Sequence, residues 1–209
     1  MSLSSAEAEH LCECVAAGGI AIFPTDTVYG VCCDPNDEQA AARLYELKGR
    51  PATRASAVMF FTLAGALTKI EDDLHESEVQ ALRTLLPGPV TLLLANRAGS
   101  FGPACTVDPG TLGLRVPLLE GGLAALQAVD RPVLQSSANL SGGPDARTLA
   151  EVPSQLQEAV DLVLDGGELP GRSSTVLDLR ELHEHGRWKV VREGALGLGD
   201  VTAALGPSG

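Results

Sequence analysis

The sequence predicts an α/β or α+β fold, in which helices flank a twisted, open, mixed sheet. Short apolar segments that favour strands alternate with helix-type segments along the chain, and this alternation is typical of a sheet covered by helices. The 209 residues suffice for one sizeable core and are few for two full domains. Since no internal repeat, long linker or change of composition divides the chain, we expect one domain over residues 1–209.

Capping residues and helix breakers define the elements of the N-terminal half. Ser4 and Glu7 have the spacing of a capping box, which predicts a helix from there to about Ala17, before two glycines. A short apolar strand over 20–23 ends at Pro24. The further expected elements are a helix from Asp37 to Lys48, with apolar residues at helical spacing, a buried strand over 57–61, a helix-prone stretch, and a helix over 76–86.

Proline and glycine mark the boundaries in the C-terminal half. Pro87-Gly88-Pro89 predicts a sharp corner before an apolar strand over 90–94, and the Gly- and Pro-rich residues 96–110 predict a loop. The remaining expected elements are a strand over 112–116 ended by Pro117, a helix over 122–129, a strand over 133–135, a helix over 148–159, and strands over 161–165, 174–179 and 187–192.

Charge and composition disfavour nucleic acids and membranes as partners. The 27 acidic and 15 basic residues give a net charge of −12, whereas proteins that bind a nucleic-acid backbone present a basic face. Aromatic residues make up 3% of the chain, too few for a base-stacking platform. No apolar run approaches the roughly 20 residues that span a bilayer, and the N-terminus lacks a signal pattern. We therefore expect a cytoplasmic protein with weak or no autonomous nucleic-acid binding.

The cysteines and histidines do not predict a metal centre. Cys12, Cys14, Cys32, Cys33 and Cys105 show no C-x-x-C spacing, which favours free thiols in a reducing compartment. Cys32 and Cys33 are neighbours and are expected to point to opposite sides of a strand. The histidines show no zinc-ligand spacing.

Two basic residues on either side of a glycine indicate an anion site. Lys48 lies at the end of a predicted helix and Arg50 follows Gly49, so the two charges repel each other unless an anion lies between them. Arginine binds phosphate or carboxylate with a bidentate fork, which lysine lacks. The alternative is that both cations only complement the helix dipole.

A second polar segment, Ser137-Ala138-Asn139, follows a predicted strand. Side chains two residues apart on an extended chain face the same side, so this hydroxyl and carboxamide are placed to meet one ligand. Gly142 and Gly143 allow the backbone to approach that ligand closely. An ordinary polar turn is the alternative.

Further polar side chains interrupt apolar segments. Arg115 lies in an apolar strand, where burial requires a carboxylate partner or a cavity, and Arg192 ends a late strand. Residues 24–27 (Pro-Thr-Asp-Thr) are suited to an amine-bearing ligand or a metal, or they simply close a turn. Cations in so acidic a chain indicate a focused anion pocket. P-loop and dinucleotide-binding motifs are absent from the sequence.

Seven segments resemble, in order, the motifs of the YrdC/Sua5 family, the threonylcarbamoyl-adenylate synthases. They are 24–30 (Pro-Thr-Asp-Thr-Val-Tyr-Gly), 48–51, 86–91, 114–117, 136–142, 174–176 and 192–194, within residues 20–194. The length is similar to that of the single-domain form of the family. The resemblance implies a YrdC-like sheet around a deep central cavity. It also implies that L-threonine, bicarbonate and ATP, with Mg²⁺, give L-threonylcarbamoyladenylate and pyrophosphate.

The resemblance also implies roles for individual residues. Those implied to bind ATP and its phosphates are Lys48, Arg50, Ser137, Asn139 and Arg192, and those implied to contact threonine or the carbamate are Thr27, Ser174 and Arg115. No covalent nucleophile is implied, because the carbamate attacks the α-phosphorus while cations stabilise the departing pyrophosphate. The implied partners are proteins of the tRNA threonylcarbamoyl transfer machinery.

Several positions depart from the family pattern: Ala55-Ser56, Met59, Asp145 and Ser173. We expect these changes to bear on the amino-acid substrate more than on the fold. Two other functions stay open: formation of carbamoyl-adenylate on the same scaffold, and a role as an RNA-binding ribosome maturation factor. Lack of room for partner domains counts against the first, and the negative charge counts against the second.

Overall fold

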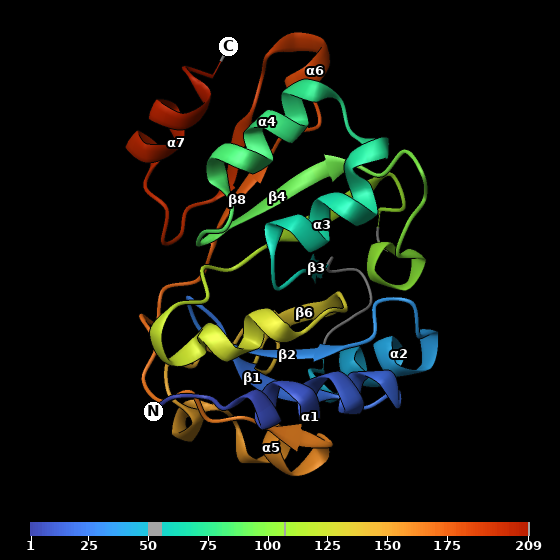
Figure 1. Ribbon diagram of the computed structural model, residues 1–209, viewed down its shortest axis with the longest axis vertical. Coiled ribbons are helices and arrows are strands. Elements are labelled where there is room, and N and C mark those ends of the chain that lie inside the picture. Colours follow the sequence, from blue (N-terminus) through green and yellow to red (C-terminus); the bar gives the residue numbers. More distant parts are fainter. Residues whose placement is uncertain (50–55, 107, 209) are drawn as a thin grey trace.

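A single mixed sheet organises the computed structural model, which describes residues 1–49, 56–106 and 108–208 (Figure 1). The nine strands in this described part have the order β7-β1-β2-β6-β3-β5-β4-β8-β9. They are β1 (Ala21–Pro24), β2 (Tyr29–Cys33), β3 (Ala57–Met59), β4 (Val90–Ala95), β5 (Thr111–Arg115), β6 (Val133–Ser137), β7 (Leu162–Val163), β8 (Thr175–Asp178) and β9 (Lys189–Arg192). The predicted fold class, a mixed sheet flanked by helices, is confirmed.

Helices cover the sheet along its length. The α-helices are α1 (Ser5–Ala16), α2 (Glu38–Leu47), α3 (Leu63–Ile70), α4 (Glu76–Leu85), α5 (Ser154–Ala159), α6 (Leu182–His185) and α7 (Leu198–Leu205). The 3₁₀ helices are η1 (Glu71–Asp73), η2 (Gly102–Cys105), η3 (Gly121–Ala128) and η4 (Leu149–Glu151). Figure 1 shows α3 and α4 over the part of the sheet that contains β4, and α1 over the part that contains β1 and β2. No helix among the described residues is long and apolar enough to cross a bilayer.

Two hydrophobic clusters lie on opposite sides of the first strands. Ile22 of β1 belongs to the larger cluster together with residues of α2, α3 and α4. Phe23, the next residue, belongs to the smaller cluster with residues of α1 and η3. Cys33 belongs to the larger cluster and Cys32 to the smaller one, as the alternation along a strand requires. The described cysteines are free thiols. Both faces of this part of the sheet are therefore buried.

The predicted capping residues begin their helices as expected. The Ser4 N–H donates to Glu7 Oε2 at 2.8 Å and the Glu7 N–H donates to Ser4 Oγ at 3.3 Å, which completes the capping box of α1. Asp37 Oδ1 accepts hydrogen bonds from the N–H groups of Gln39 and Ala40 at the start of α2. These side chains satisfy backbone donors that a helix end leaves without partners.

Some predicted elements differ from the structure for local reasons. The helix expected over 122–129 is the 3₁₀ helix η3, which begins at two glycines and has no capping side chain. The helix expected over 148–159 is divided at Pro153 into η4 and α5. Strand β2 was not among the predicted elements because all its residues are buried, which removes the alternating pattern. Helix α7 was also not predicted, because glycines surround its start.

The strand order brings together segments that are far apart in the sequence. Strand β6 pairs antiparallel with β2, so that Ser137 lies opposite Gly30. Strand β3 pairs with both β5 and β6, and β8 pairs parallel with β4. The polar ends of β5, β6 and β8 consequently surround one region of the sheet.

Tyr29 anchors the segment that leaves β7. Its hydroxyl accepts a hydrogen bond from the Gly166 N–H at 3.0 Å and lies 2.8 Å from Asp165 Oδ1 and 2.9 Å from the Gly167 carbonyl oxygen, either of which can accept its proton. Burial and the neighbouring Asp165 carboxylate raise the pKa of the Tyr29 phenol. The phenol therefore stays protonated and keeps this loop fixed to β2.

We predict that Tyr29→Phe lowers the free energy of unfolding by about 1–2 kcal/mol, because it removes the hydroxyl that accepts from the Gly166 N–H and bonds to Asp165 or Gly167. Urea denaturation measures this change. Tyr45→Phe is the matched control, since no described residue bonds to the buried Tyr45 hydroxyl. An equal loss of stability in both variants would contradict the anchoring role of Tyr29.

Candidate functional site

A cavity of about 440 Å³ lies where the strand ends converge. Its wall contains every described residue that was predicted to bind a ligand except Thr27: Lys48, Arg115, Ser137, Asn139, Ser174 and Arg192. Arg50 lies outside the described residues, so its predicted pairing with Lys48 stays a prediction. Residues from distant parts of the sequence thus meet in one hollow, as the anion-pocket hypothesis requires.

Lys48 is buried at the C-terminal end of α2, with 2% of its surface exposed. Its ammonium group donates hydrogen bonds to the Ser137 carbonyl oxygen and, at 3.3 Å, to Asn139 Oδ1. Its own carbonyl oxygen accepts a hydrogen bond from the Ser141 N–H at 3.0 Å. The end of α2 is therefore joined to the segment after β6, and the cation sits beside the predicted hydroxyl and carboxamide.

Ser137 and Asn139 have fixed orientations. Ser137 Oγ donates to Asn139 Oδ1 at 2.8 Å, and Asn139 Nδ2 donates to the Gly143 carbonyl oxygen at 2.6 Å. Gly142 has a φ of +82°, a conformation that other residues rarely adopt, and it lets the chain turn back toward Asn139. The segment is a turn and part of the cavity wall at once, so the turn drawn from the sequence is present and ligand binding by Ser137 and Asn139 stays a prediction.

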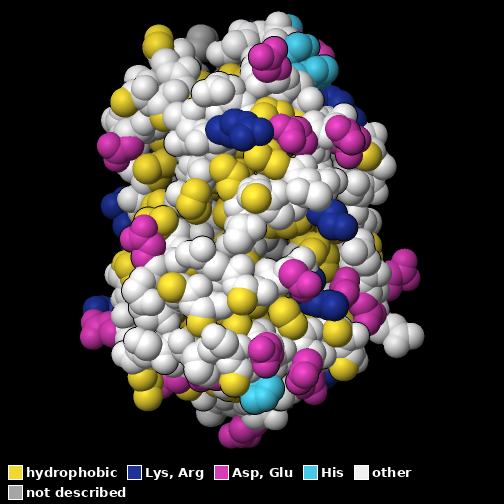
Figure 2. Space-filling view, viewed as in Figure 1, with side chains coloured by type: hydrophobic (Ala, Val, Ile, Leu, Met, Phe, Trp, Pro, Cys, Tyr) yellow, Lys and Arg dark blue, Asp and Glu magenta, His cyan; other side chains and the backbone are white. Residues whose placement is uncertain are grey.

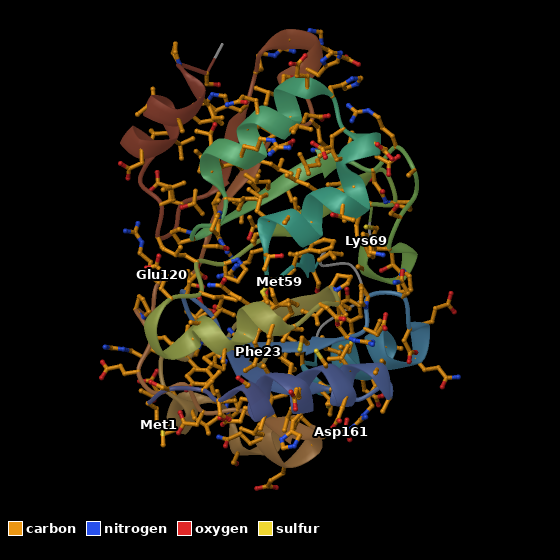
Figure 3. All side chains as sticks on the ribbon, in the orientation of Figure 1. Met1, Phe23, Met59, Lys69, Glu120 and Asp161 are labelled. Carbon is orange, nitrogen blue, oxygen red and sulfur yellow. The ribbon has the colours of Figure 1, made fainter. Side chains whose placement is uncertain are left out.

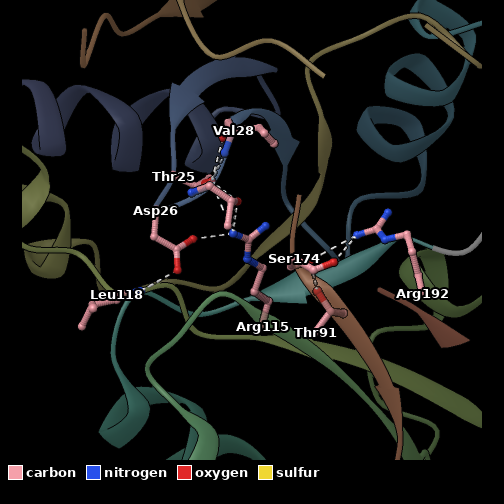
Figure 4. A network of polar contacts seen from close by, with 9 residues as sticks. Thr25, Asp26, Val28, Thr91, Arg115, Leu118, Ser174 and Arg192 are labelled. Carbon is pink, nitrogen blue, oxygen red and sulfur yellow. Dashed lines mark hydrogen bonds and ion pairs between the residues drawn. The ribbon is translucent and has the colours of Figure 1, made fainter. Parts of the chain in front are cut away.

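Arg115 is buried and paired, as its place in an apolar strand predicted. Its Nη2 donates to Asp26 Oδ1 at 2.5 Å, to Thr27 Oγ1 at 2.6 Å and to Thr25 Oγ1 at 3.4 Å (Figure 4). The Arg115 and Asp26 side chains are 4% and 6% exposed. The pair is shielded from water, where a charge without a partner is costly.

Thr25 and Asp26 are occupied by the protein itself. Thr25 Oγ1 donates to the Val28 carbonyl oxygen at 2.7 Å and accepts from the Val28 N–H, so it closes a turn. Asp26 Oδ2 accepts from the Leu118 N–H at 3.0 Å while Oδ1 accepts from Arg115. Of the two alternatives for residues 24–27, the structure shows the turn, in which both Asp26 carboxylate oxygens already bond to the protein. Thr27 contacts Arg115 from behind the cavity wall.

On the opposite wall, Ser174 joins two strands. Its hydroxyl lies 2.8 Å from Thr91 Oγ1, and Arg192 Nη2 donates to the Ser174 carbonyl oxygen at 2.8 Å and to Oγ at 3.3 Å (Figure 4). A Cβ atom at Gly194 would lie 2.4 Å from the backbone of 173–175. Glycine at this position therefore allows the chain after β9 to pack against the segment that carries Ser174.

The sequence departures have different positions relative to the cavity. Asp145, Ser173 and Ser56 line the wall, and Asp145 supplies a carboxylate among the cations Lys48, Arg115 and Arg192. Met59 does not: it is fully buried in the smaller hydrophobic cluster, in the middle of the molecule near Phe23 (Figure 3). Ala55 lies outside the described residues.

Several wall residues were missed at the level of sequence. Thr91, Gln135, Ser136 and Ser141 line the cavity in addition to the predicted set. Thr91 and Gln135 are isolated polar residues in otherwise apolar strands, a signal that could have found them, because a buried polar side chain needs a partner or a cavity.

The charged residues on the visible surface are consistent with the prediction of a local anion pocket instead of a broad basic face. On the face shown in Figure 2, lysine and arginine side chains stand singly among acidic and apolar ones. Within the described ranges, no group of three or more His, Cys, Asp or Glu residues could hold a metal ion without further ligands.

Comparison with known proteins shows which family this chain resembles. Residues 13–194 match the Sua5/yciO/yrdC family model, which carries the description "telomere recombination". The chain is 31% identical over 195 residues to a threonylcarbamoyl-AMP synthase of Pyrococcus abyssi, covering 92% of this chain and 55% of that protein. It is 34% identical over 177 residues to a threonylcarbamoyl-AMP synthase of Stutzerimonas stutzeri, covering 82% of this chain and 92% of that protein.

Solved structures give the same fold. The crystal structure of P. abyssi Sua5 complexed with L-threonine is similar with a TM-score of 0.85 at 26% identity, covering 100% of this chain and 60% of that one. This chain therefore spans somewhat more than half of the archaeal relative and nearly the whole of the bacterial one.

Proposed function

Because the chain belongs to the Sua5/yciO/yrdC family, we propose that it is a nucleotidyltransferase that forms L-threonylcarbamoyladenylate and pyrophosphate from L-threonine, bicarbonate and ATP. One observation carries the proposal: Lys48, Ser137, Asn139 and Arg192 line the same cavity as Arg115 and Ser174. The first four residues supply donors for a polyphosphate, and Arg115 and Ser174 supply donors for a small carboxylate.

The nucleotide is proposed to lie against Lys48, Ser137, Asn139 and Arg192, together with Arg50. Lys48 is largely removed from water, so its charge acts on a phosphate through a low local dielectric. Negative charge builds on the pyrophosphate as it departs, and cations that are already in position stabilise it without rearrangement. These residues therefore bind and orient the nucleotide, and none of them forms a covalent bond to it.

Threonine is proposed to bind at Arg115 and Ser174, and Thr27, which was also predicted to contact it, would act through its hydrogen bond with Arg115. Its neutral amine takes up bicarbonate with loss of water and becomes a carbamate. A carbamate oxygen then attacks the α-phosphorus, the bond to the β,γ-pyrophosphate breaks, and pyrophosphate leaves with the electron pair. The chain contributes alignment of the two reactants, which can account for a large part of the acceleration.

Mg²⁺ is proposed to enter with ATP. Magnesium in nucleotide sites is held by one or two carboxylates and by the phosphates, and it retains several waters. Asp145 supplies a carboxylate at the cavity wall, which is the kind of ligand that Mg²⁺ takes beside phosphates. When bound, the ion would neutralise charge on the phosphates.

The product is a reactive mixed anhydride, so we propose that it passes to proteins of the tRNA threonylcarbamoyl transfer machinery. The substrates ATP, threonine and bicarbonate favour a cytoplasmic place for the reaction. The negative net charge supports the view that this chain does not hold the tRNA by itself.

The proposed reaction predicts that pyrophosphate release depends on ATP, threonine and bicarbonate together. Omitting each substrate in turn tests it, with release followed by a coupled assay. Release that needs carbamoyl phosphate instead would indicate carbamoyl-adenylate formation. Lack of turnover combined with tight, salt-sensitive RNA binding would indicate the RNA-binding alternative.

We predict that Lys48→Met lowers ATP-dependent turnover on the order of 100-fold, because the aliphatic stem stays packed while the charge is lost. Steady-state kinetics measure the loss. Lys69→Met, at an exposed position near the end of α3, is the matched control and should keep full activity (Figure 3). Turnover within twofold of the unaltered protein in Lys48→Met would contradict the nucleotide site.

A separate prediction concerns Asp145. Asp145→Asn should raise the Mg²⁺ concentration needed for half-maximal binding of a non-hydrolysable ATP analogue several-fold, because a metal ligand loses its charge. Titration calorimetry at a series of Mg²⁺ concentrations measures this change, with the exposed Asp72→Asn as control. Tighter binding of the analogue in Asp145→Asn would instead show that the carboxylate only repels phosphate.

A further inference from the structure

We propose that Asp26 is a positioning residue for the amino-acid substrate, because it fixes the direction of the Arg115 guanidinium and cancels its charge. This inference rests on the proposed function, since it assigns Arg115 to the threonine or carbamate. Asp26 does not line the cavity itself. It acts through Arg115, which does.

The hydrogen bonds of Asp26 hold Arg115 from two directions. Asp26 Oδ1 accepts from Arg115 Nη2 at 2.5 Å, and Oδ2 accepts from the Leu118 N–H at 3.0 Å. Arg115 is the last residue of β5 and Leu118 follows shortly after, so one carboxylate binds both a side chain and the backbone of the same segment (Figure 4). The turn between β1 and β2 is thereby tied to the end of β5.

A third acceptor restricts the guanidinium further. Thr27 Oγ1 accepts from the same Nη2 at 2.6 Å and lies 3.1 Å from Thr25 Oγ1. Nη2 is thus fully engaged by the protein. Arg115 Nε is buried and has no partner among the described residues, so donor capacity remains on the guanidinium. A planar group held at one nitrogen presents its remaining donors in a fixed direction.

The charge balance separates two parts of the cavity. With Asp26 as its counter-ion, Arg115 adds little net charge and recognises a ligand through directed hydrogen bonds. Lys48 and Arg192 keep a positive charge on other parts of the wall. Without Asp26, Arg115 would be a buried cation without its counter-ion, and a phosphate would compete with the amino acid for it. The ion pair therefore favours the amino-acid carboxylate or carbamate at Arg115 and leaves phosphate to the other cations.

The test is Asp26→Asn in the full-length chain, assayed by pyrophosphate release with varied threonine and varied ATP. The threonine KM should rise on the order of 10- to 100-fold, as the loss of a supporting contact commonly causes, while the ATP KM changes less than threefold. Asp26→Glu, which restores the charge, should recover part of the loss.

Asp178→Asn is the matched control. Asp178 is as buried as Asp26, with 5% of its side chain exposed, and it pairs with Arg180 at 2.7 Å away from this cavity. Its loss should lower the melting temperature without changing the threonine KM. A role that is only structural would make Asp26→Asn behave in the same way and would overturn the inference.

A double-mutant cycle tests the route through Arg115 and covers the case in which Asp26→Asn does not fold. The pair Asp26→Asn with Arg115→Gln removes both buried charges and should have the same threonine KM as Arg115→Gln alone. A further loss in the double variant would overturn the inference. Failure of the unaltered protein to use threonine would overturn the proposed function as well, whereas an active protein whose threonine KM is unchanged in Asp26→Asn would overturn the positioning role alone.

Discussion

The ion pair between Arg115 and Asp26 is the constraint on which the rest of the site depends. A guanidinium at the end of a central strand is stable only with a counter-ion and acceptors around it. Asp26 reaches it only because the turn after β1 lies against the end of β5. Arg115 is itself part of the cavity wall, so the counter-ion that allows its burial also fixes one residue of the site.

The order of the strands in the sheet determines which residues form the other walls of the cavity. Strand β6 lies between β2 and β3, and β8 lies beside β4, so each wall combines residues from distant parts of the chain. Hydrogen bonds then fix the side chains: Lys48 against Asn139, Ser137 against Asn139, and Arg192 against Ser174. Most polar groups of the wall are thus oriented by protein partners before a ligand binds, which reduces the entropic cost of binding.

Local signals allowed much of this to be predicted from sequence. The capping residues Ser4 and Asp37 began their helices as expected, and Arg115, alone in an apolar strand, was paired as burial requires. Contacts between distant parts of the chain could not be predicted from the sequence. Strand β2 is buried on both faces and shows no alternation, and the partner of Asp26 lies 89 residues away. The sequence therefore left open whether residues 24–27 bind a ligand or close a turn, and the structure shows that Thr25 and Asp26 bond to the protein itself.

The strand order also has a consequence for biosynthesis. Strand β1 pairs with β7, β2 with β6 and β4 with β8, so one neighbour of each earlier strand is translated much later. Contacts between such distant segments form slowly, because long loops must close first. A nascent chain that stops before Ser174 lacks Ser174, Val176 and Arg192, and with them one part of the cavity wall.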